Sequence, residues 1–355
     1  MDIPKTMKAA VLFDYGDLRV TEVPVPDLGS GDVLVKVNSV AICGSDPAII
    51  AKGWKGHEKL GEFIPGHEFT GDVVATAPDV ARIKVGDRVA VEPHKGCGRC
   101  ENCIRGLYTT CLNYGKHEAG HRHFGFSSNG AYAEFANCYE TMLHKLPESI
   151  SYDEGALLTT VGTVLYGYER IGWVKPGETV VVTGPGAIGL ISALLAKILG
   201  AGLVIMTGTR EQRLAVGREM GVDISLNVKE LDAVEKVMEL TNGVGADMVV
   251  ECTGQPGPAA DALDMIRKNG RISYNGIYHE PVTLQLDKIV QWNLLITGPK
   301  AEGMWSMERA VPLMADGRLD LKPMITHTFR LDEINEAFDT FTGRKGGAIK
   351  VIVKP

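Results

Sequence analysis

The residues from Thr179 to Gly189 constrain the fold more than any other segment of the chain. The β-branched run Thr179–Thr183 leads directly into Gly184–Gly189, which reads Gly-Pro-Gly-Ala-Ile-Gly, and an apolar stretch with helical spacing follows. This is a G-x-G-x-x-G turn between a strand and a helix. Gly184 permits the tight turn, Gly186 lets backbone amides approach a pyrophosphate, and Gly189 lets the helix pack closely on the strand. The segment therefore predicts a dinucleotide-binding unit.

The surrounding pattern predicts two domains, because 355 residues exceed what one hydrophobic core usually organises. Strand-like and helix-like segments alternate after Ser151, which is typical of a parallel sheet covered by helices. The preceding part consists of short β segments separated by Gly, Pro and Asp, and the last sixty or so residues return to a mixed pattern. We expect an α/β chain with a mostly β domain from residues 1–152 and 297–355 and a doubly wound parallel sheet in residues 153–296.

Composition excludes several classes of protein. The net charge of −7 argues against nucleic acid or an anionic membrane as a partner. No run of about 20 apolar residues is present, so no membrane-spanning helix is expected. The segment Met1–Lys8 lacks the apolar stretch of a secretory signal. Together with an odd total of seven cysteines, these features predict a cytoplasmic protein with reduced thiols.

The segment about 20 residues after the glycine turn bears on the choice of dinucleotide, because an acidic residue there usually holds the ribose of NAD. Gly208 stands in that place, followed by Thr209 and Arg210, with Arg213 one turn later. The glycine removes a carboxylate that would repel a 2′-phosphate, and a guanidinium fork suits a phosphate. The pattern favours NADP(H) over NAD(H), although a solvated turn that merely starts a helix is the plain alternative.

Four cysteines lie close together at Cys97, Cys100, Cys103 and Cys111. Four thiolates at this spacing can close a tetrahedral shell, as in a structural zinc site. An iron–sulfur cluster, free core cysteines and disulfides are the alternatives, and no proline follows the fourth cysteine as it does in bacterial ferredoxins. We expect a structural zinc ion.

A second group of possible metal ligands is scattered: Cys43 in Cys43-Gly-Ser45-Asp46, and the pair His67-Glu68. Taken alone, such residues more often serve packing or solvation. Taken together with the glycine turn and the four cysteines, they resemble the zinc-dependent medium-chain alcohol dehydrogenases, in particular the branch of sorbitol, threonine and secondary-alcohol dehydrogenases. The resemblance extends along nearly the whole chain. The further matching segments are Gly66–Gly71, Val85–Val89, Gly130–Glu134 and Glu251–Gly254.

The resemblance implies a GroES-like catalytic domain and a Rossmann domain, with the cofactor and a catalytic zinc ion meeting between them. It implies that Cys43 and His67 ligate that zinc, that Ser45 relays the substrate proton, and that Glu68 is a ligand or a switching neighbour. It also implies a homodimer or homotetramer. The residues expected to bind the dinucleotide are Gly184, Gly186, Ala187, Ile188, Gly189, Gly208, Thr209, Arg210, Arg213, Thr253 and Gly276.

The implied activity is hydride transfer between NADP(H) and a zinc-bound secondary alcohol or polyol, or the matching ketone. Two departures from the family qualify it. Thr159 and Thr160 stand where relatives place another zinc ligand, so we expect Cys43, His67, Glu68 and water or substrate around the ion. An arginine–aromatic pair that suits polyols is absent near residues 300–302. A non-catalytic NADPH-binding protein and a zinc-free quinone reductase are the alternative functions.

One tempting motif is set aside. His117-Glu118-Ala119-Gly120-His121 spells the H-E-x-x-H pattern of metalloproteases, which requires both histidines on one face of a helix. Glycines interrupt this stretch and no apolar period supports a helix, so we expect a loop.

Overall fold

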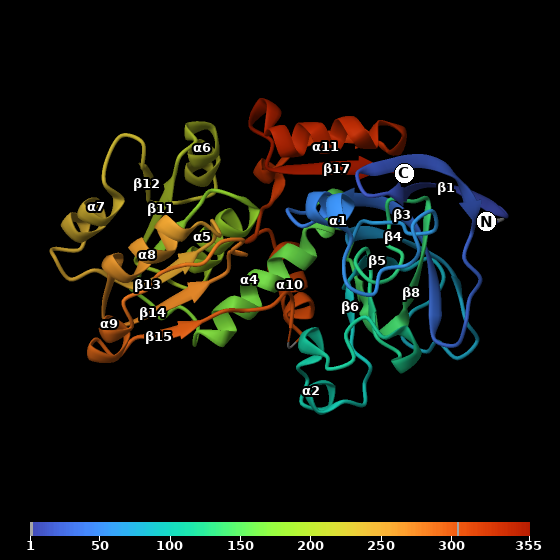
Figure 1. Cartoon of the computed structure of the whole chain (residues 1–355), viewed down its shortest axis with the longest axis horizontal. Coiled ribbons are helices and arrows are strands. Elements are labelled where there is room, and N and C mark those ends of the chain that lie inside the picture. Colours follow the sequence, from blue (N-terminus) through green and yellow to red (C-terminus); the bar gives the residue numbers. More distant parts are fainter. Residues whose placement is uncertain (1–2, 304) are drawn as a thin grey trace. The chain divides into compact units, whose positions relative to one another are not determined.

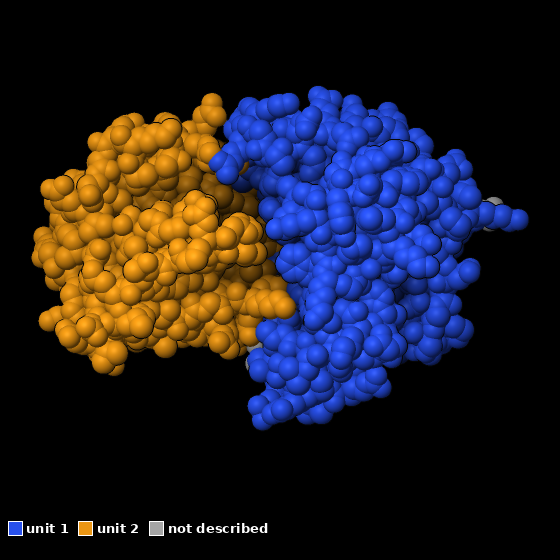
Figure 2. Space-filling model, in the orientation of Figure 1, with its two compact units in different colours: residues 1–159, 303–315, 325–355 blue, residues 160–302, 316–324 orange. Residues whose placement is uncertain are grey.

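The computed structural model describes residues 3–303 and 305–355 (Figure 1), which form two compact units. Unit 1 comprises residues 1–159, 303–315 and 325–355, and unit 2 comprises residues 160–302 and 316–324 (Figure 2). The domain boundaries expected from the sequence, after residue 152 and before residue 297, stay a prediction. Residues 316–324, which that prediction assigns to the first domain, belong to unit 2.

Unit 2 is built on a six-stranded parallel sheet with β10 (Thr179–Thr183) near its centre. The strand order is β12-β11-β10-β13-β14-β15, so the chain builds outward from β10 and then returns to its other side. This reversal makes the sheet doubly wound and confirms the predicted α/β class. The remaining strands are β11 (Leu203–Gly208), β12 (Ile224–Asn227), β13 (Ala246–Glu251), β14 (Ile266–Tyr274) and β15 (Leu295–Thr297).

Helices cover this sheet because its strands are apolar on both faces. Val180, Val181 and Val182 of β10 are all fully buried, although successive side chains of a strand point to opposite faces of the sheet. Helices α5 and α6 pack on β10, β11 and β12, whereas α8 packs on β13 and β14 with α7 beside it. The helices are α4 (Leu158–Arg170), α5 (Ala187–Ile198), α6 (Glu211–Glu219), α7 (Ala233–Leu240), α8 (Pro256–Met265) and α9 (Leu286–Gln291).

Unit 1 is mostly β, as expected. Its main sheet has seven strands in the order β16-β17-β3-β4-β5-β9, with β8 also paired to β3. Strand β17 comes from the end of the chain and lies antiparallel to β3, so the last residues complete the sheet of the first. The strands are β3 (Asp32–Ala41), β4 (Glu68–Thr76), β5 (Arg88–Val91), β8 (Phe135–Tyr139), β9 (Leu143–Lys145), β16 (Ile325–Arg330) and β17 (Lys350–Lys354).

Shorter elements close unit 1 around its apolar core. The hairpin of β1 (Thr6–Asp14) and β2 (Asp17–Pro24) contributes buried residues to that core. A second pair joins β6 (His94–Lys95) to β7 (Arg122–His123). The helices are α1 (Asp46–Lys52), α2 (Glu101–Ile104), α3 (Tyr152–Ala156), α10 (Ser306–Ala315) and α11 (Ile334–Gly343). None of the helices in the described part of the chain has the length and apolarity needed to cross a membrane.

Candidate functional site

The residues Cys43, His67 and Glu68 come together in unit 1. Cys43 follows β3, Glu68 opens β4, and the pairing of Ala41 with Glu68 holds these two strand ends side by side. One ligand atom from each of the three side chains lies within 4.8 Å of the others. His67 is 3% exposed and Glu68 2%. A thiolate, an imidazole and a carboxylate at this separation form a donor set that fits a zinc ion and leaves a fourth position open.

Asp46 supports this group from behind. Its carboxylate is fully buried, and one of its oxygens lies 3.2 Å from Nδ1 of His67, which leaves Nε2 of that ring for an ion. The other oxygen accepts hydrogen bonds from the Cys43 amide and the Tyr132 hydroxyl, each 2.8 Å long. Burial disfavours a charged imidazole, yet the charges of Asp46 and Cys43 raise the pKa of His67 well above its usual value. A carboxylate behind a ligating histidine orients the ring and strengthens its bond to a metal.

Ser45 offers a hydroxyl beside the same group. The residue precedes α1 but its side chain does not cap that helix. Its Oγ is buried and forms no hydrogen bond with any of the described residues. A buried hydroxyl without a partner is costly unless a ligand satisfies it, so the Ser45 hydroxyl is available to a polar ligand atom.

A buried ion pair joins Glu68 to Lys350, the first residue of β17. Both side chains are 3% exposed. Burial disfavours the ammonium group, but the charges of Glu68 and Cys43 raise the pKa of Lys350 above its usual value. Lys350 thereby offsets one of the negative charges that surround the candidate ion. The sequence prediction missed this residue, although a lysine inside the apolar run 348–353 was a usable signal.

Aromatic rings line the His67 side of the group. The Phe126 ring lies 4.6 Å from the His67 ring and 5.2 Å from that of Trp54. Phe126 also stacks on His123 at 3.8 Å. These contacts fix the imidazole in one orientation and give unit 1 an apolar surface beside the candidate ligands.

The four cysteines form a second, closed cluster in the loop that carries α2 (Figure 1). The Sγ atoms of Cys97 and Cys103 are 3.9 Å apart, and those of Cys100 and Cys111 are 3.8 Å apart. Zinc–sulfur bonds of about 2.3 Å in a tetrahedron place the sulfurs about 3.8 Å from one another. The spacing fits a zinc ion with no open position, and all four thiols are free of disulfides.

Backbone and side-chain N–H groups donate hydrogen bonds to these sulfurs, which favours the negatively charged thiolate. Asn113 Nδ2 donates to Cys97 Sγ at 3.3 Å, and the Cys103 amide donates to Cys100 Sγ at 3.5 Å. Although burial opposes it, such donors lower the pKa of Cys97 to about 6. Burial raises the pKa of Cys103 to about 12. A divalent cation resolves this difference because it holds every ligating cysteine as the thiolate.

In unit 2, the glycine turn has the geometry that its sequence predicts. Gly184 has φ +91°, a value that favours glycine. A Cβ on Gly189 would lie 1.9 Å from the Gly184 carbonyl oxygen, so no side chain fits there. A Cβ on Gly186 would meet open space, and Gly186 is also the N-cap of α5. Open space at the N-terminus of a twelve-residue helix suits a pyrophosphate, with Ala187 and Ile188 as the first residues beyond the cap.

The carboxyl end of β11, at Gly208, lies beside this turn. A Cβ on Gly208 would lie 2.5 Å from Cδ of Pro185, so packing against the glycine turn excludes an acidic side chain at this position. Thr209 and Arg210 are exposed, and Arg213 is half-buried. Burial, followed by the charge of Arg210, lowers the pKa of Arg213. Two arginines that repel each other next to a phosphate-binding turn would gain from a bound anion.

Thr253 and Gly276 lie on the other side of the turn. A Cβ on Gly184 would lie 2.8 Å from Cγ2 of Thr253. A Cβ on Gly276 would lie 2.3 Å from the Gly254 amide nitrogen, so the ends of β13 and β14 also approach closely. The glycine turn, Gly208, Thr253 and Gly276 therefore lie at or just after the carboxyl ends of β10, β11, β13 and β14, and Arg210 and Arg213 lie at the start of α6.

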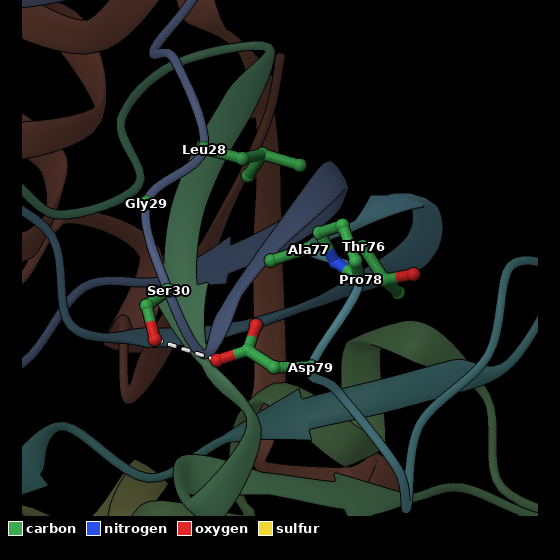
Figure 3. Close-up of a pocket in the computed structure, with 7 residues that line it drawn as sticks. All are labelled: Leu28, Gly29, Ser30, Thr76, Ala77, Pro78 and Asp79. Atoms are coloured by element: carbon green, nitrogen blue, oxygen red, sulfur yellow. Dashed lines mark hydrogen bonds between the residues drawn. The ribbon is translucent and has the colours of Figure 1, made fainter.

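Two other features do not belong to either site. A surface pocket of 490 Å³ between residues 28–30 and 76–79 contains none of the predicted ligands (Figure 3). Its Asp79 accepts hydrogen bonds from the Ser30 hydroxyl and the Gly31 amide, which serves the turn. The H-E-x-x-H stretch forms a single 3₁₀ turn, His117–Ala119, that ends at Gly120 in the left-handed region. It therefore lacks the helix that a metalloprotease site requires.

Two family models match the chain. Residues 29–148 match the alcohol dehydrogenase GroES-like domain, and residues 187–316 match the zinc-binding dehydrogenase domain. The chain belongs to the zinc-dependent medium-chain alcohol dehydrogenases. The predicted family and the two predicted folds of this dehydrogenase are thereby confirmed.

Relatives of this dehydrogenase cover almost its whole length. It is 31% identical to sorbitol dehydrogenase of Bacillus subtilis, across 99% of this chain and 98% of that protein. It is 34% identical to L-threonine 3-dehydrogenase of Pyrococcus horikoshii, across 96% of each. A crystal structure of a zinc-binding dehydrogenase from Sinorhizobium meliloti, bound to NADP, superposes with a TM-score of 0.91 at 27% identity, covering 99% of this chain and 100% of that one.

Proposed function

We propose that this dehydrogenase oxidises a secondary alcohol or polyol with NADP, or reduces the matching ketone with NADPH, at a catalytic zinc ion held by Cys43, His67 and Glu68. The observation that carries the proposal is the approach of these three ligand atoms to within 4.8 Å. Sorbitol and L-threonine, named in two of the relatives, both carry secondary hydroxyl groups. A protein that only binds NADPH, or a zinc-free quinone reductase, has no use for this donor set.

The residues of the site divide the work. When bound, zinc supplies a Lewis acid that lowers the pKa of an alcohol, and NADP supplies the hydride acceptor. Ser45 accepts the hydrogen bond of the substrate hydroxyl at Oγ and, as it takes up that proton, passes its own hydroxyl proton onward to water. Asp46 keeps the His67 ring in place. Because Lys350 also pairs with the Glu68 carboxylate, Glu68 can help to hold the ion while the fourth coordination position of the ion stays open.

The preference for NADP rests on Gly208, the last residue of β11, and on the residues that follow it. The packing of Gly208 against Pro185 keeps a carboxylate away from the ribose, and Arg210 supplies an exposed guanidinium nearby. Arg210 forms no ion pair within the described residues, so its charge is free to meet a 2′-phosphate. The NADP bound in the Sinorhizobium meliloti structure supports the same choice.

Changing Arg210 to Ala tests this preference. The KM for NADP should rise about tenfold to a hundredfold, since hydrogen bonds to charged groups contribute about 1.5–3 kcal/mol. The KM for NAD should stay within about twofold, because NAD lacks the phosphate. Arg218→Ala is a matched control on the following helix, because Arg218 is engaged with Glu211 and Ser225. Equal effects of Arg210→Ala on both cofactors would contradict the phosphate contact.

Changing Cys100 to Ser tests the closed cluster. The purified protein should contain about two zinc ions per chain, and this variant about one, because a structural site needs all four thiolates. We expect a lower melting temperature, while the zinc that remains still supports turnover. Cys43→Ser is the matched control. It should lose the other zinc ion and the activity, but its melting temperature should stay closer to that of the wild type. A stable but inactive Cys100→Ser protein would reverse the assignment of the two sites.

The proposed function itself is tested with a panel of secondary alcohols, polyols, amino alcohols and sugars. The appearance of NADPH should follow the addition of one class of substrate and disappear after zinc is removed with a chelator. Turnover that survives complete removal of zinc would favour the quinone reductase alternative. The cysteines, all reduced, suit the cytosol, where we place the protein. Assembly into a homodimer or homotetramer stays a prediction.

A further inference from the structure

Glu251 is a buried acid at the point where the sheet of unit 2 reverses its direction. It is the last residue of β13 and is fully buried. β13 lies next to β10, whose carboxyl end runs into the glycine turn. A dinucleotide binds at this reversal point of a doubly wound sheet. Because the adenosine ribose belongs on the β11 side, at Arg210, the nicotinamide half must extend over the ends of β13 and β14.

The hydrogen-bond partners of Glu251 are all donors, which suit a carboxylate. Each oxygen accepts a hydrogen bond from a backbone amide, Oε1 from Thr253 at 2.6 Å and Oε2 from Gly254 at 3.2 Å. The hydroxyl groups of Thr183, Thr253 and Tyr278 donate to it as well. Burial and this hydrogen bond raise the pKa of Tyr278, so Tyr278 keeps its proton.

Among the residues that the structure describes, no cationic side chain forms an ion pair with Glu251. All of the partners that the described residues offer to Glu251 are uncharged, in contrast to Glu68, which is paired with Lys350. A negative charge held by hydrogen bonds alone in a buried place attracts a nearby cation more strongly than it would in water. The nicotinamide ring is such a cation in NADP⁺, and it becomes neutral when it accepts a hydride.

We infer that Glu251 is a positioning residue whose charge makes this dehydrogenase bind NADP⁺ more tightly relative to NADPH. The inference rests on the proposed function, because it requires a dinucleotide at the glycine turn. Preferential binding of the oxidised cofactor shifts the equilibrium on the enzyme toward NADP⁺, and so toward the reduction of a carbonyl substrate. Glu251 does not touch the reacting atoms; it acts through the field at the end of β13.

The test compares the dissociation constants of NADP⁺ and NADPH by titration calorimetry. In Glu251→Gln the ratio of the NADP⁺ constant to the NADPH constant should rise roughly tenfold, as expected for losing one buried charge near the ring. Tyr278→Phe is the matched control, because it removes a hydrogen bond and leaves the charge, so its ratio should stay within about twofold of wild type. Tyr278→Lys places an ammonium group on the same carboxylate and should reproduce the shifted ratio if Glu251→Gln does not fold.

The outcomes separate the possible failures. Equal weakening of both cofactors in Glu251→Gln and in Tyr278→Lys would show that Glu251 only holds the loops together, and would overturn the inference. An unchanged ratio would overturn it as well, while leaving the proposed function intact. A wild-type protein that binds neither cofactor would overturn both the proposed function and this inference.

Discussion

Replacing His67 with Ala should lower the rate of alcohol oxidation by more than about a thousandfold, beyond the 10–100-fold typical of altering an outer-shell partner. The variant loses one of three ligands that lie within 4.8 Å of one another, and the remaining thiolate and carboxylate bind zinc too weakly to keep it in place. Metal analysis of the purified variant should show the loss of one zinc ion per chain.

Two comparisons make this prediction specific. The dissociation constant of NADP should be unchanged, because the residues expected to bind it all belong to unit 2. Asp46→Asn keeps every ligand and alters only the group behind the imidazole, so its loss of zinc affinity should fall in the 10–100-fold range. Undiminished turnover in His67→Ala would remove this ion from the reaction altogether.

Replacing Lys350 with Met should lower the free energy of unfolding by about 3–5 kcal/mol, the usual result of removing one partner of a buried ion pair. The Glu68 carboxylate would lose its ammonium partner in a place that is 3% exposed. The loss should grow after chelation of zinc, because the ion is then no longer present to offset the charge of this carboxylate. Chemical denaturation, followed with and without chelator, measures both effects.

Lys354→Met is the matched control on the same strand. Lys354 pairs with Asp153, but both side chains are about one-third exposed, 34% and 30%. Exposed pairs contribute about 0–1 kcal/mol, so this variant should be almost as stable as wild type. The double variant Glu68→Gln/Lys350→Met should regain much of the lost stability, because it removes both charges. Equal losses in Lys350→Met and Lys354→Met would show that the buried pair stabilises the fold no more than the exposed pair does.

The sequence predicts unit 2 well because its signals are local. The strand at Thr179–Thr183 has the same bounds in the structure as in the sequence prediction. Repeated strand–helix alternation also determines the parallel sheet. Unit 1 was harder to predict: β8 and β9 are short, and their place beside β3 and β5 depends on pairing between distant residues.

The candidate ligands, too, could be predicted only where their signals are local in the sequence. The four cysteines are recognisable because their spacing alone describes a closed site, whereas Cys43 and His67 gain meaning only from the family resemblance. Asp46 lies inside a recognised motif, but its contact with His67 becomes visible only when β3 and β4 are paired. Lys350 lies 282 residues from Glu68, and no local pattern connects the two. Glu251 was recognised as part of a motif, but its charge-holding environment comes from three separate segments.

The strand that brings Lys350 to Glu68 also sets an order of events during synthesis. The ribosome synthesises Cys43, His67 and Glu68 long before β17. For a time the nascent chain therefore has these candidate ligands but lacks the positive charge of Lys350. The sheet of unit 2 lies within one continuous stretch and can form first, as expected for contacts that close shorter loops. Early binding of zinc would offset the charge of the Glu68 carboxylate before Lys350 is synthesised. The supply of zinc would then help to determine the yield of folded protein.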